Sequence, residues 1–304
     1  MTSGVPTGTI LEGDAVEMIQ TLPSESIDCV ITSPPYFRLR DYQVKGQIGV
    51  EGTVEEWVSE LRAVAAALHR VLRPSGTFWL NLGDSYSTHQ GEGAPRKSML
   101  GAPERVMLAL VEDGWTVRNK VVWAKTNPMP TSVRDRLSTT HEVIFLLTKS
   151  VKYYFDLDAI RQPHRSRPPK RHDAPRPGKY ASGSPWLGAN SDGDDGLRRL
   201  KARGLVGHAK GKNPGDVWRF ATAHYTGAHF ATFPPSLVER MMRAGSPKGG
   251  IVLDPFMGAG TTAVVAEREQ RQWLGIELNP RFIAQSYRRI EEARDTSSKR
   301  KEVI

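Results

Sequence analysis

The sequence predicts an α/β fold built on a mostly parallel, doubly wound sheet. Short apolar segments rich in β-branched residues alternate with segments that carry apolar residues at helical spacing, as in strands connected by helices. One predicted strand ends in a glycine-rich turn, Gly258-Ala259-Gly260, that opens directly into a helix. Ligands of such sheets bind at turns of this kind. The alternation stops between Arg161 and Arg219, which predicts a loop-rich insertion.

The spacing of apolar residues along the chain predicts the position of each strand and helix. Strands are expected at Ile27–Thr32, Thr77–Leu82, Val117–Trp123, Val143–Leu147, Gly250–Leu253 and Trp273–Glu277. Helices are expected at Val54–Leu72, Pro235–Ala244, Thr261–Arg268 and Pro280–Ala293. The longest helix should end at the breaker segment 73–76 (RPSG). Its buried face is expected to comprise Trp57, Leu61, Val64, Leu68 and Val71.

The basic charge is concentrated in the insertion. The formal net charge is +9, and residues 161–219 hold 14 Lys and Arg against 5 Asp and Glu, which accounts for the whole excess. Such a segment favours a surface for a polyanion such as nucleic acid. We therefore expect one domain formed by 1–160 and 221–295, a target-recognition insertion at 161–220, and a flexible polar tail at 296–304.

Composition excludes several classes of protein. Hydrophobic residues make up 38% and charged residues 25% of the 304 residues, as in ordinary globular proteins. No apolar stretch approaches the ~20 residues of a membrane span, and no signal peptide is visible. We expect a cytoplasmic protein without membrane contact. The single cysteine, Cys29, excludes an intrachain disulfide and a Cys-rich zinc site, and no metal is expected.

Residues 251–262 (IVLDPFMGAGTT) predict a cofactor site. An apolar strand ends in Asp254, and the glycines after it allow a ligand to approach the backbone closely. The next strand ends in Glu277, an acidic residue well placed to bond two ribose hydroxyls. The turn lacks the lysine of a phosphate-binding loop and the third glycine of the dinucleotide fingerprint. The turn therefore fits a cofactor that contains a nucleoside but no pyrophosphate better than it fits a nucleotide or a dinucleotide.

Residues 32–36 (TSPPY) follow another strand end, on the same edge of the sheet. Pro34 and Pro35 stiffen the loop and present a carbonyl, because proline has no N–H. Ser33 offers a hydroxyl and Tyr36 a flat aromatic face. A planar heterocycle with an amino group could stack on Tyr36 while its N–H groups bond to Ser33 and the Pro34 carbonyl.

Together the two motifs resemble those of the amino-methylating DNA methyltransferases. TSPPY is similar to the catalytic motif of that family and LDPFMGAGTT to its cofactor motif. The order of the motifs, with the basic insertion between them, resembles the circularly permuted class called beta. Shorter matches are Gly13-Asp14, residues 81–84 (NLGD), residues 140–142 (THE) and residues 229–234 (HFATFP).

The resemblance implies S-adenosyl-L-methionine as cofactor and methylation of N4 of a flipped cytosine in double-stranded DNA. The implied cofactor residues are Asp14, Phe230, Ala231, Thr232, Asp254, Phe256, Gly258, Gly260, Thr261, Thr262 and Glu277. The implied catalytic residues are Ser33, Pro34, Pro35 and Tyr36, with Asp84 as a proton acceptor or as a group that polarises Ser33. The candidate DNA contacts in the insertion are Arg198, Arg199, Lys201 and Arg203. A cognate restriction endonuclease and a homodimer stay open as partners.

The chemistry needs no covalent intermediate. The lone pair of an aromatic amine is delocalised into the ring, and hydrogen bonds to Ser33 and Pro34 could localise it for in-line transfer. Carbon-5 methylation would need a thiolate, whereas Cys29 lies within a predicted strand and is expected in the core. N6-adenine methylation uses the same chemistry and stays open, as does RNA or protein methylation. Intact cofactor and acceptor motifs argue against a purely DNA-binding module.

Overall fold

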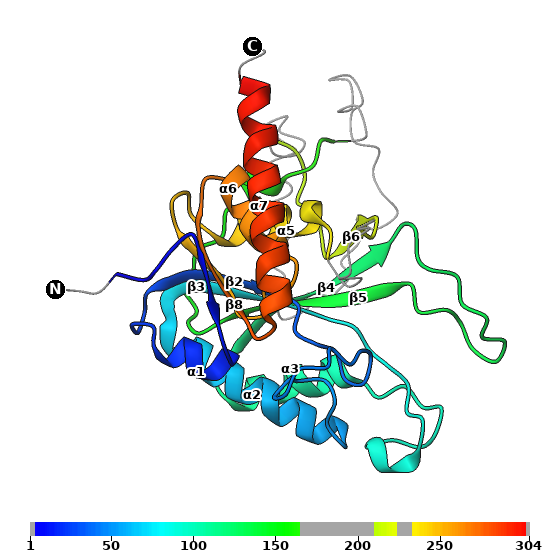
Figure 1. Cartoon of the computed structure of the whole chain (residues 1–304). Helices are drawn as coiled ribbons and strands as arrows, with labels where there is room; N and C mark the ends of the chain where they lie inside the picture. Colours follow the sequence, from blue (N-terminus) through cyan, green and yellow to red (C-terminus); the bar gives the residue numbers. More distant parts are fainter. Residues whose placement is uncertain (1–3, 165–209, 224–232, 302–304) are drawn as a thin grey trace, which may run out of the picture. The chain divides into compact units, whose positions relative to one another are not determined.

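The computed structural model describes residues 4–164, 210–223 and 233–301. Contacts divide the chain into one unit of Met1–Asp156 with Gly215–Ile304, and a second unit of Leu157–Pro214. The first unit contains an 8-stranded sheet with helices on both faces (Figure 1). The predicted doubly wound α/β architecture is confirmed.

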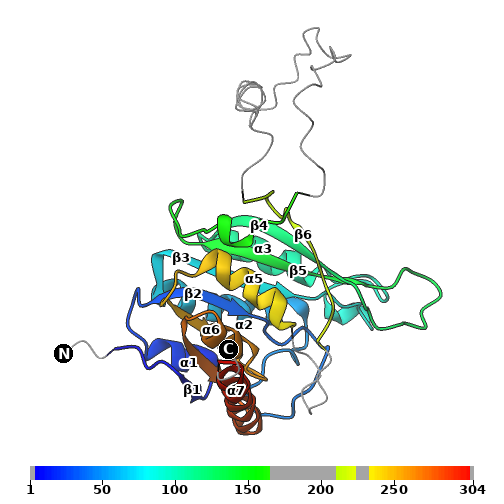
Figure 2. The same ribbon diagram turned by 90° about the horizontal axis from the view of Figure 1, so that it is seen from above.

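The sheet is mostly parallel, as predicted. Its strands are β1 (Thr9–Glu12), β2 (Ile27–Thr32), β3 (Leu72–Leu82), β4 (Thr116–Lys125), β5 (His141–Thr148), β6 (Val217–Phe220), β7 (Ile251–Asp254) and β8 (Gln272–Glu277). They pair in the order β1-β8-β7-β2-β3-β5-β4-β6. Figure 2 shows β1, β2 and β3 followed by β4, β5 and β6 as the sheet is seen from above. Within this sheet β5 is antiparallel to both β3 and β4, and the other pairs are parallel.

Helices form a layer on each face of the sheet. They are α1 (Ala15–Gln20), α2 (Val54–Val71), α3 (Ala102–Glu112), α5 (Pro235–Gly245), α6 (Thr261–Arg268) and α7 (Pro280–Lys301), with short 3-10 turns at Gln90–Glu92 and Asp158–Ile160. Helices α1, α2 and α3 cover one face, and α5, α6 and α7 the other (Figure 1). Helix α2 starts with a capping box between Thr53 and Glu56. Its predicted apolar face is buried.

Strand β3 begins at Leu72 instead of at the predicted Thr77, so the breaker segment 73–76 lies within the strand. Leu72 pairs with Ile27 and Thr77 with Cys29, so residues 73–76 bulge out between two paired positions. The paired residues that flank this segment, Leu72 and Thr77, keep it extended despite its proline and glycine. Helix α2 ends at Val71, just before the breaker, as predicted, and the breaker itself forms a bulge within β3.

Two further boundaries differ from the prediction. Strand β6 lies within the range 161–220 that was assigned to the insertion, yet it pairs with β4 and belongs to the sheet. Helix α7 continues through Lys301 instead of ending at Ala293, so the first residues of the expected tail are helical. Across the described parts of the chain, no helix combines the length and apolarity that a membrane crossing requires.

Candidate active site

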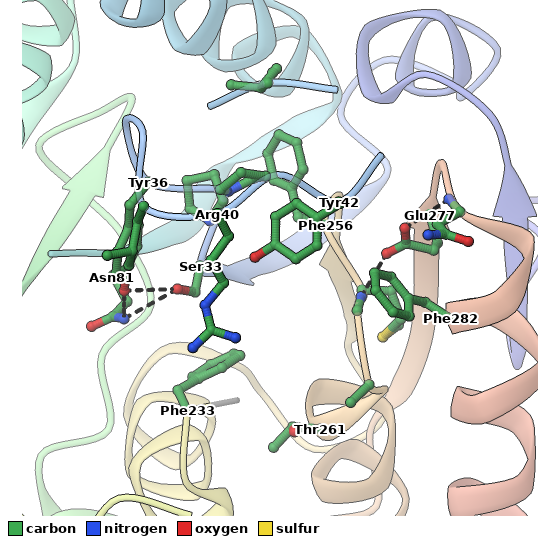
Figure 3. A pocket seen from close by; sticks show the side chains of 18 of the residues that line it. Ser33, Tyr36, Arg40, Tyr42, Asn81, Phe233, Phe256, Thr261, Glu277 and Phe282 are labelled. Atoms are coloured by element: carbon green, nitrogen blue, oxygen red, sulfur yellow. Dashed lines mark hydrogen bonds between the residues drawn. The ribbon is translucent and has the colours of Figure 1, made fainter. Parts of the chain in front are cut away.

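A cavity of about 550 Å³ lies where the carboxyl ends of β1, β8, β7 and β2 meet. Its wall includes the TSPPY loop after β2 and the glycine turn after β7. Because these strands are parallel and adjacent, their ends share one edge of the sheet. Figure 3 shows Ser33, Tyr36 and Asn81 at one end of the cavity and Glu277 with Phe282 at the other.

The TSPPY loop is held by contacts behind it. The Trp57 indole N–H donates to the Pro35 carbonyl at 3.0 Å and ties the loop to α2. The Tyr36 ring packs over Gly83, where a Cβ atom would lie 2.7 Å from the ring. A side chain at position 83 would therefore displace Tyr36, and glycine is required for this approach.

A hydrogen-bond network joins the hydroxyls of Ser33 and Tyr36 to the half-buried ion pair of Lys125 and Glu142. The Ser33 and Tyr36 hydroxyls lie 3.0 Å apart, and the Tyr36 hydroxyl donates to Glu142 Oε2 at 2.6 Å. Asn81 Nδ2 donates to the Tyr36 oxygen at 2.7 Å and to Glu142 Oε2 at 2.8 Å. Lys125 Nζ lies 2.6 Å from Glu142 Oε1. Burial, followed by the Glu142 carboxylate, raises the pKa of Tyr36 well above its usual value, so the phenol keeps its proton.

Asp84 has another role than the one expected. Its Oδ1 accepts hydrogen bonds from the Ser85 and Ala102 N–H groups, and its Oδ2 accepts one from the Gly101 N–H, at 2.9–3.0 Å. These bonds cap α3, whose N-cap residue Gly101 has no side chain to do so. The carboxylate that contacts the Tyr36 hydroxyl is Glu142, so the expectation for Asp84 is corrected.

The glycine turn supplies the other end of the cavity. Phe256, Gly258 and Thr261 line it, together with Asp14. The Asp14 carboxylate also accepts from the Val16 N–H at 2.8 Å and so caps α1. The turn opens directly into α6 with the left-handed backbone of Gly260, φ 73°, which favours glycine.

Glu277 faces the cavity from the end of β8. Its Oε2 accepts from the Gly258 N–H at 2.8 Å and its Oε1 from the Asn279 N–H at 2.9 Å. A carboxylate oxygen has a second lone pair, so both can also accept from a ligand hydroxyl. Burial raises the pKa of Glu277 above its usual value. Phe256 and Phe282 provide aromatic surface at this end (Figure 3).

Asp254, Gly260 and Thr262 were expected to contact the cofactor, but they lie behind the cavity wall. Asp254 is completely buried and accepts from the Thr32 and Thr262 hydroxyls, each at 2.6 Å. Thr32 directly precedes Ser33, so Asp254 ties the acceptor loop to the glycine turn. Its role in this structure is to brace the site.

A family model described as DNA methylase matches residues 27–288, most of the chain. The chain belongs to the DNA methylase family. The Type II methyltransferase M.XycI of Xanthomonas campestris pv. cyanopsidis is 37% identical over 304 residues, covering 93% of this methylase and 87% of that protein. The Type II methyltransferase M.SmaI of Serratia marcescens is 37% identical over 302 residues, covering 92% and 90%.

Solved structures agree on the fold of this methylase. The PvuII DNA methyltransferase (cytosine-N4-specific) has a TM-score of 0.65 at 21% identity, covering 96% of this chain and 92% of that one. TTHA0409 from Thermus thermophilus, complexed with S-adenosyl-L-methionine, has a TM-score of 0.59 at 25% identity, covering 94% and 95%.

Some predicted contacts of the methylase fall outside the described residues. These are Phe230, Ala231, Thr232, Arg198, Arg199, Lys201 and Arg203. Among the described residues, no group of His, Cys, Asp or Glu is arranged to hold a metal ion. Cys29 is fully buried in β2, and burial raises its pKa to about 12. A thiol so protonated cannot act as the nucleophile of carbon-5 methylation.

Sequence reasoning missed several residues of the cavity wall. Asn81, Lys125, Glu142, Arg40, Tyr42 and Phe233 line the cavity. Three of them lie in segments already matched to the family, at 81–84, 140–142 and 229–234, so the signal was present without an assigned role. Arg40 and Tyr42 lie in the loop after TSPPY, where neither periodicity nor a motif distinguishes them.

We expect Asp254 to make folding stability depend on pH. Burial raises its pKa from 3.8 to about 6, so the native state binds this proton more tightly than the unfolded chain. The free energy of unfolding should therefore fall as pH rises from about 4 to about 6. This shift of the pKa corresponds to a decrease of about 3 kcal/mol in the free energy of unfolding.

Asp254→Asn keeps the shape of the side chain and removes this titration. Urea unfolding of both proteins from pH 4 to pH 7 measures the effect, and the shared contribution of the other carboxylates cancels in the difference. The variant should gain stability relative to the wild type as pH rises. A pH-independent difference would contradict this role of Asp254.

Proposed function

We propose that this methylase transfers a methyl group from S-adenosyl-L-methionine to N4 of cytosine in double-stranded DNA. The observation that carries the proposal is the cavity shared by Ser33 and Pro34 at one end and Glu277 at the other. A nucleoside bound at Glu277 and an amine bound at Ser33 would meet within it.

The Glu277 end fits the nucleoside of S-adenosyl-L-methionine. The carboxylate can accept from two ribose hydroxyls, and Phe256 and Phe282 offer flat apolar surface. When bound, this cofactor supplies an electrophilic methyl group on its sulfonium centre. The related protein TTHA0409 is complexed with the same molecule.

The Ser33 end fits the amine of a base that has left the duplex, which costs a few kcal/mol. Stacking on Tyr36 would recover about 1–3 kcal/mol. The Pro35 carbonyl is bonded to Trp57, so we assign the two acceptors for the amine N–H groups to Ser33 and the Pro34 carbonyl. Positioning of the amine for in-line transfer can contribute ~7–11 kcal/mol.

Cytosine is preferred over adenine because Ser33 occupies the position where adenine enzymes of this family usually carry Asp or Asn. The PvuII enzyme, which shares the fold, is described as cytosine-N4-specific. The proposal includes DNA recognition by the part of the basic insertion 161–220 that precedes β6. It also includes a cognate restriction endonuclease, since M.XycI and M.SmaI are Type II methyltransferases.

The modified nucleoside tests the proposal directly. DNA is incubated with the enzyme and methyl-labelled S-adenosyl-L-methionine, hydrolysed to nucleosides and separated against standards. We expect the label in N4-methyldeoxycytidine, and none when cofactor is omitted. Label in N6-methyldeoxyadenosine would overturn the choice of base, and label in RNA or protein but not in DNA would overturn the substrate class.

A further inference from the structure

The hydrogen bonds behind Ser33 have a definite direction, because Glu142 can only accept. The single proton of the Tyr36 hydroxyl is donated to Glu142 Oε2 at 2.6 Å. The contact of 3.0 Å between Ser33 Oγ and the Tyr36 oxygen must then be donated by Ser33. The raised pKa of Tyr36 agrees with this direction, since the phenol stays a donor to Glu142.

The orientation of Asn81 points to the same carboxylate. Its Nδ2 lies against three acceptors, Glu142 Oε2, the Tyr36 oxygen and Ser33 Oγ. Its Oδ1 is buried without a hydrogen-bond partner among the described residues. The reverse orientation would place an amide oxygen against a carboxylate oxygen. Glu142 thus orients both neighbours, and Lys125 at 2.6 Å holds the carboxylate in place.

We propose that Glu142, held by Lys125, is a positioning residue that fixes Ser33 as a hydrogen-bond acceptor and so selects a base with an amino group over one with a carbonyl. This inference rests on the proposed function, in which Ser33 and Pro34 receive the amine. With its proton turned to Tyr36, Ser33 presents only lone pairs to the base.

The selection follows from the chemistry of the two pyrimidines. Cytosine carries an amino group at carbon 4, and both of its N–H groups find acceptors. Uracil and thymine carry an oxygen there, which would face the Ser33 oxygen and the Pro34 carbonyl without a donor. A site that hydrogen-bonds an N–H group of its substrate rejects an analogue without that group, because the buried polar groups of the site are then left unpaired.

Lys125 determines what the Glu142→Gln substitution would do. The Lys125 ammonium group only donates, so the oxygen of the new side-chain amide would turn toward Lys125 and its NH2 group toward Tyr36. Tyr36 would no longer need to donate at that position, and its proton could turn to Ser33. The Glu142→Gln variant should therefore lose the fixed polarity of Ser33 while keeping nearly the same side-chain volume.

Discrimination between two bases at the target position tests this role. Two duplexes contain the DNA sequence that the enzyme methylates, one with cytosine and one with uracil at the target position. The target base lies opposite an abasic site in both, so no base pair must be broken when it leaves the duplex. Dissociation constants are measured by fluorescence anisotropy with S-adenosylhomocysteine present. We expect the wild type to prefer cytosine by about tenfold or more, and Glu142→Gln to bring the two affinities close together.

Glu104→Gln is the matched control, because Glu104 pairs with Lys120, which also lies on β4. It should keep the wild-type preference. Tyr36→Phe breaks the chain of hydrogen bonds without changing charge and should lose the preference even if Glu142→Gln fails to fold. Retention of the preference in folded Glu142→Gln or Tyr36→Phe, or its absence in the wild type, would overturn the inference.

The outcome is separable from that of the proposed function. If the wild type methylates adenine, the choice of cytosine fails, and the same measurement is made with adenine and hypoxanthine, which also differ by an amino group against a carbonyl. Loss of turnover in Glu142→Gln with an unchanged preference would assign Glu142 a purely structural role.

Discussion

Replacing Ser33 by alanine should lower the turnover number of DNA methylation by about 10²–10³-fold. Ser33 lies at the end of β2 in the cavity wall, hydrogen-bonded to Tyr36 and Asn81. Its oxygen is the acceptor that orients the amine for attack, and a small misplacement of the reacting atoms costs about 10²-fold. Single-turnover kinetics measure the loss.

Cofactor affinity should stay close to the wild-type value in Ser33→Ala, because Glu277 lies at the other end of the cavity (Figure 3). Ser26→Ala is the control: Ser26 precedes β2 at its opposite end, and its hydroxyl donates to the carbonyl of the neighbouring Pro23 at 2.7 Å. It should be as active as the wild type. Weakened binding of S-adenosyl-L-methionine to folded Ser33→Ala would place this loop in the cofactor site instead.

Replacing Glu277 by alanine should raise the dissociation constant of S-adenosyl-L-methionine by about 10²-fold or more. Each hydrogen bond to a charged group contributes about 1.5–3 kcal/mol, and two ribose hydroxyls would be affected. The carboxylate also accepts from the Gly258 and Asn279 N–H groups, so the glycine turn loses support as well. Isothermal titration calorimetry measures the change.

We also expect Glu277 to make the binding of S-adenosyl-L-methionine depend on pH. Burial raises the pKa of Glu277, and the charged carboxylate is the better acceptor. Affinity should therefore fall as pH is lowered through this raised pKa, and Glu277→Gln should bind weakly with a flatter profile. Glu60→Ala, on the exposed side of α2, should behave as the wild type. An unchanged affinity of Glu277→Ala would show that Glu277 serves only the turn.

Local pattern was enough to predict the elements that carry the two motifs. Strand Ile27–Thr32 and helix Thr261–Arg268 begin and end where periodicity, proline and glycine place them. Because carboxyl ends of parallel strands share an edge, the sequence also predicted that TSPPY and the glycine turn face one site, and the cavity joins them.

The hydrogen-bond partners within the site depend on which strands pair in the sheet, and the local sequence pattern does not contain this information. Strand β5 pairs antiparallel with β3 and β4, which sets Glu142 opposite Trp123 and Ile144 opposite Asn81. This register brings Glu142 to Asn81 and Lys125, whereas Asp84, just beyond the end of β3, meets the start of α3 and is used as a cap. Sequence alone therefore determined the fold class and the two motifs. Only tertiary structure decided which carboxylate serves Ser33, because a side chain's partners are set by the register of strands distant in the chain.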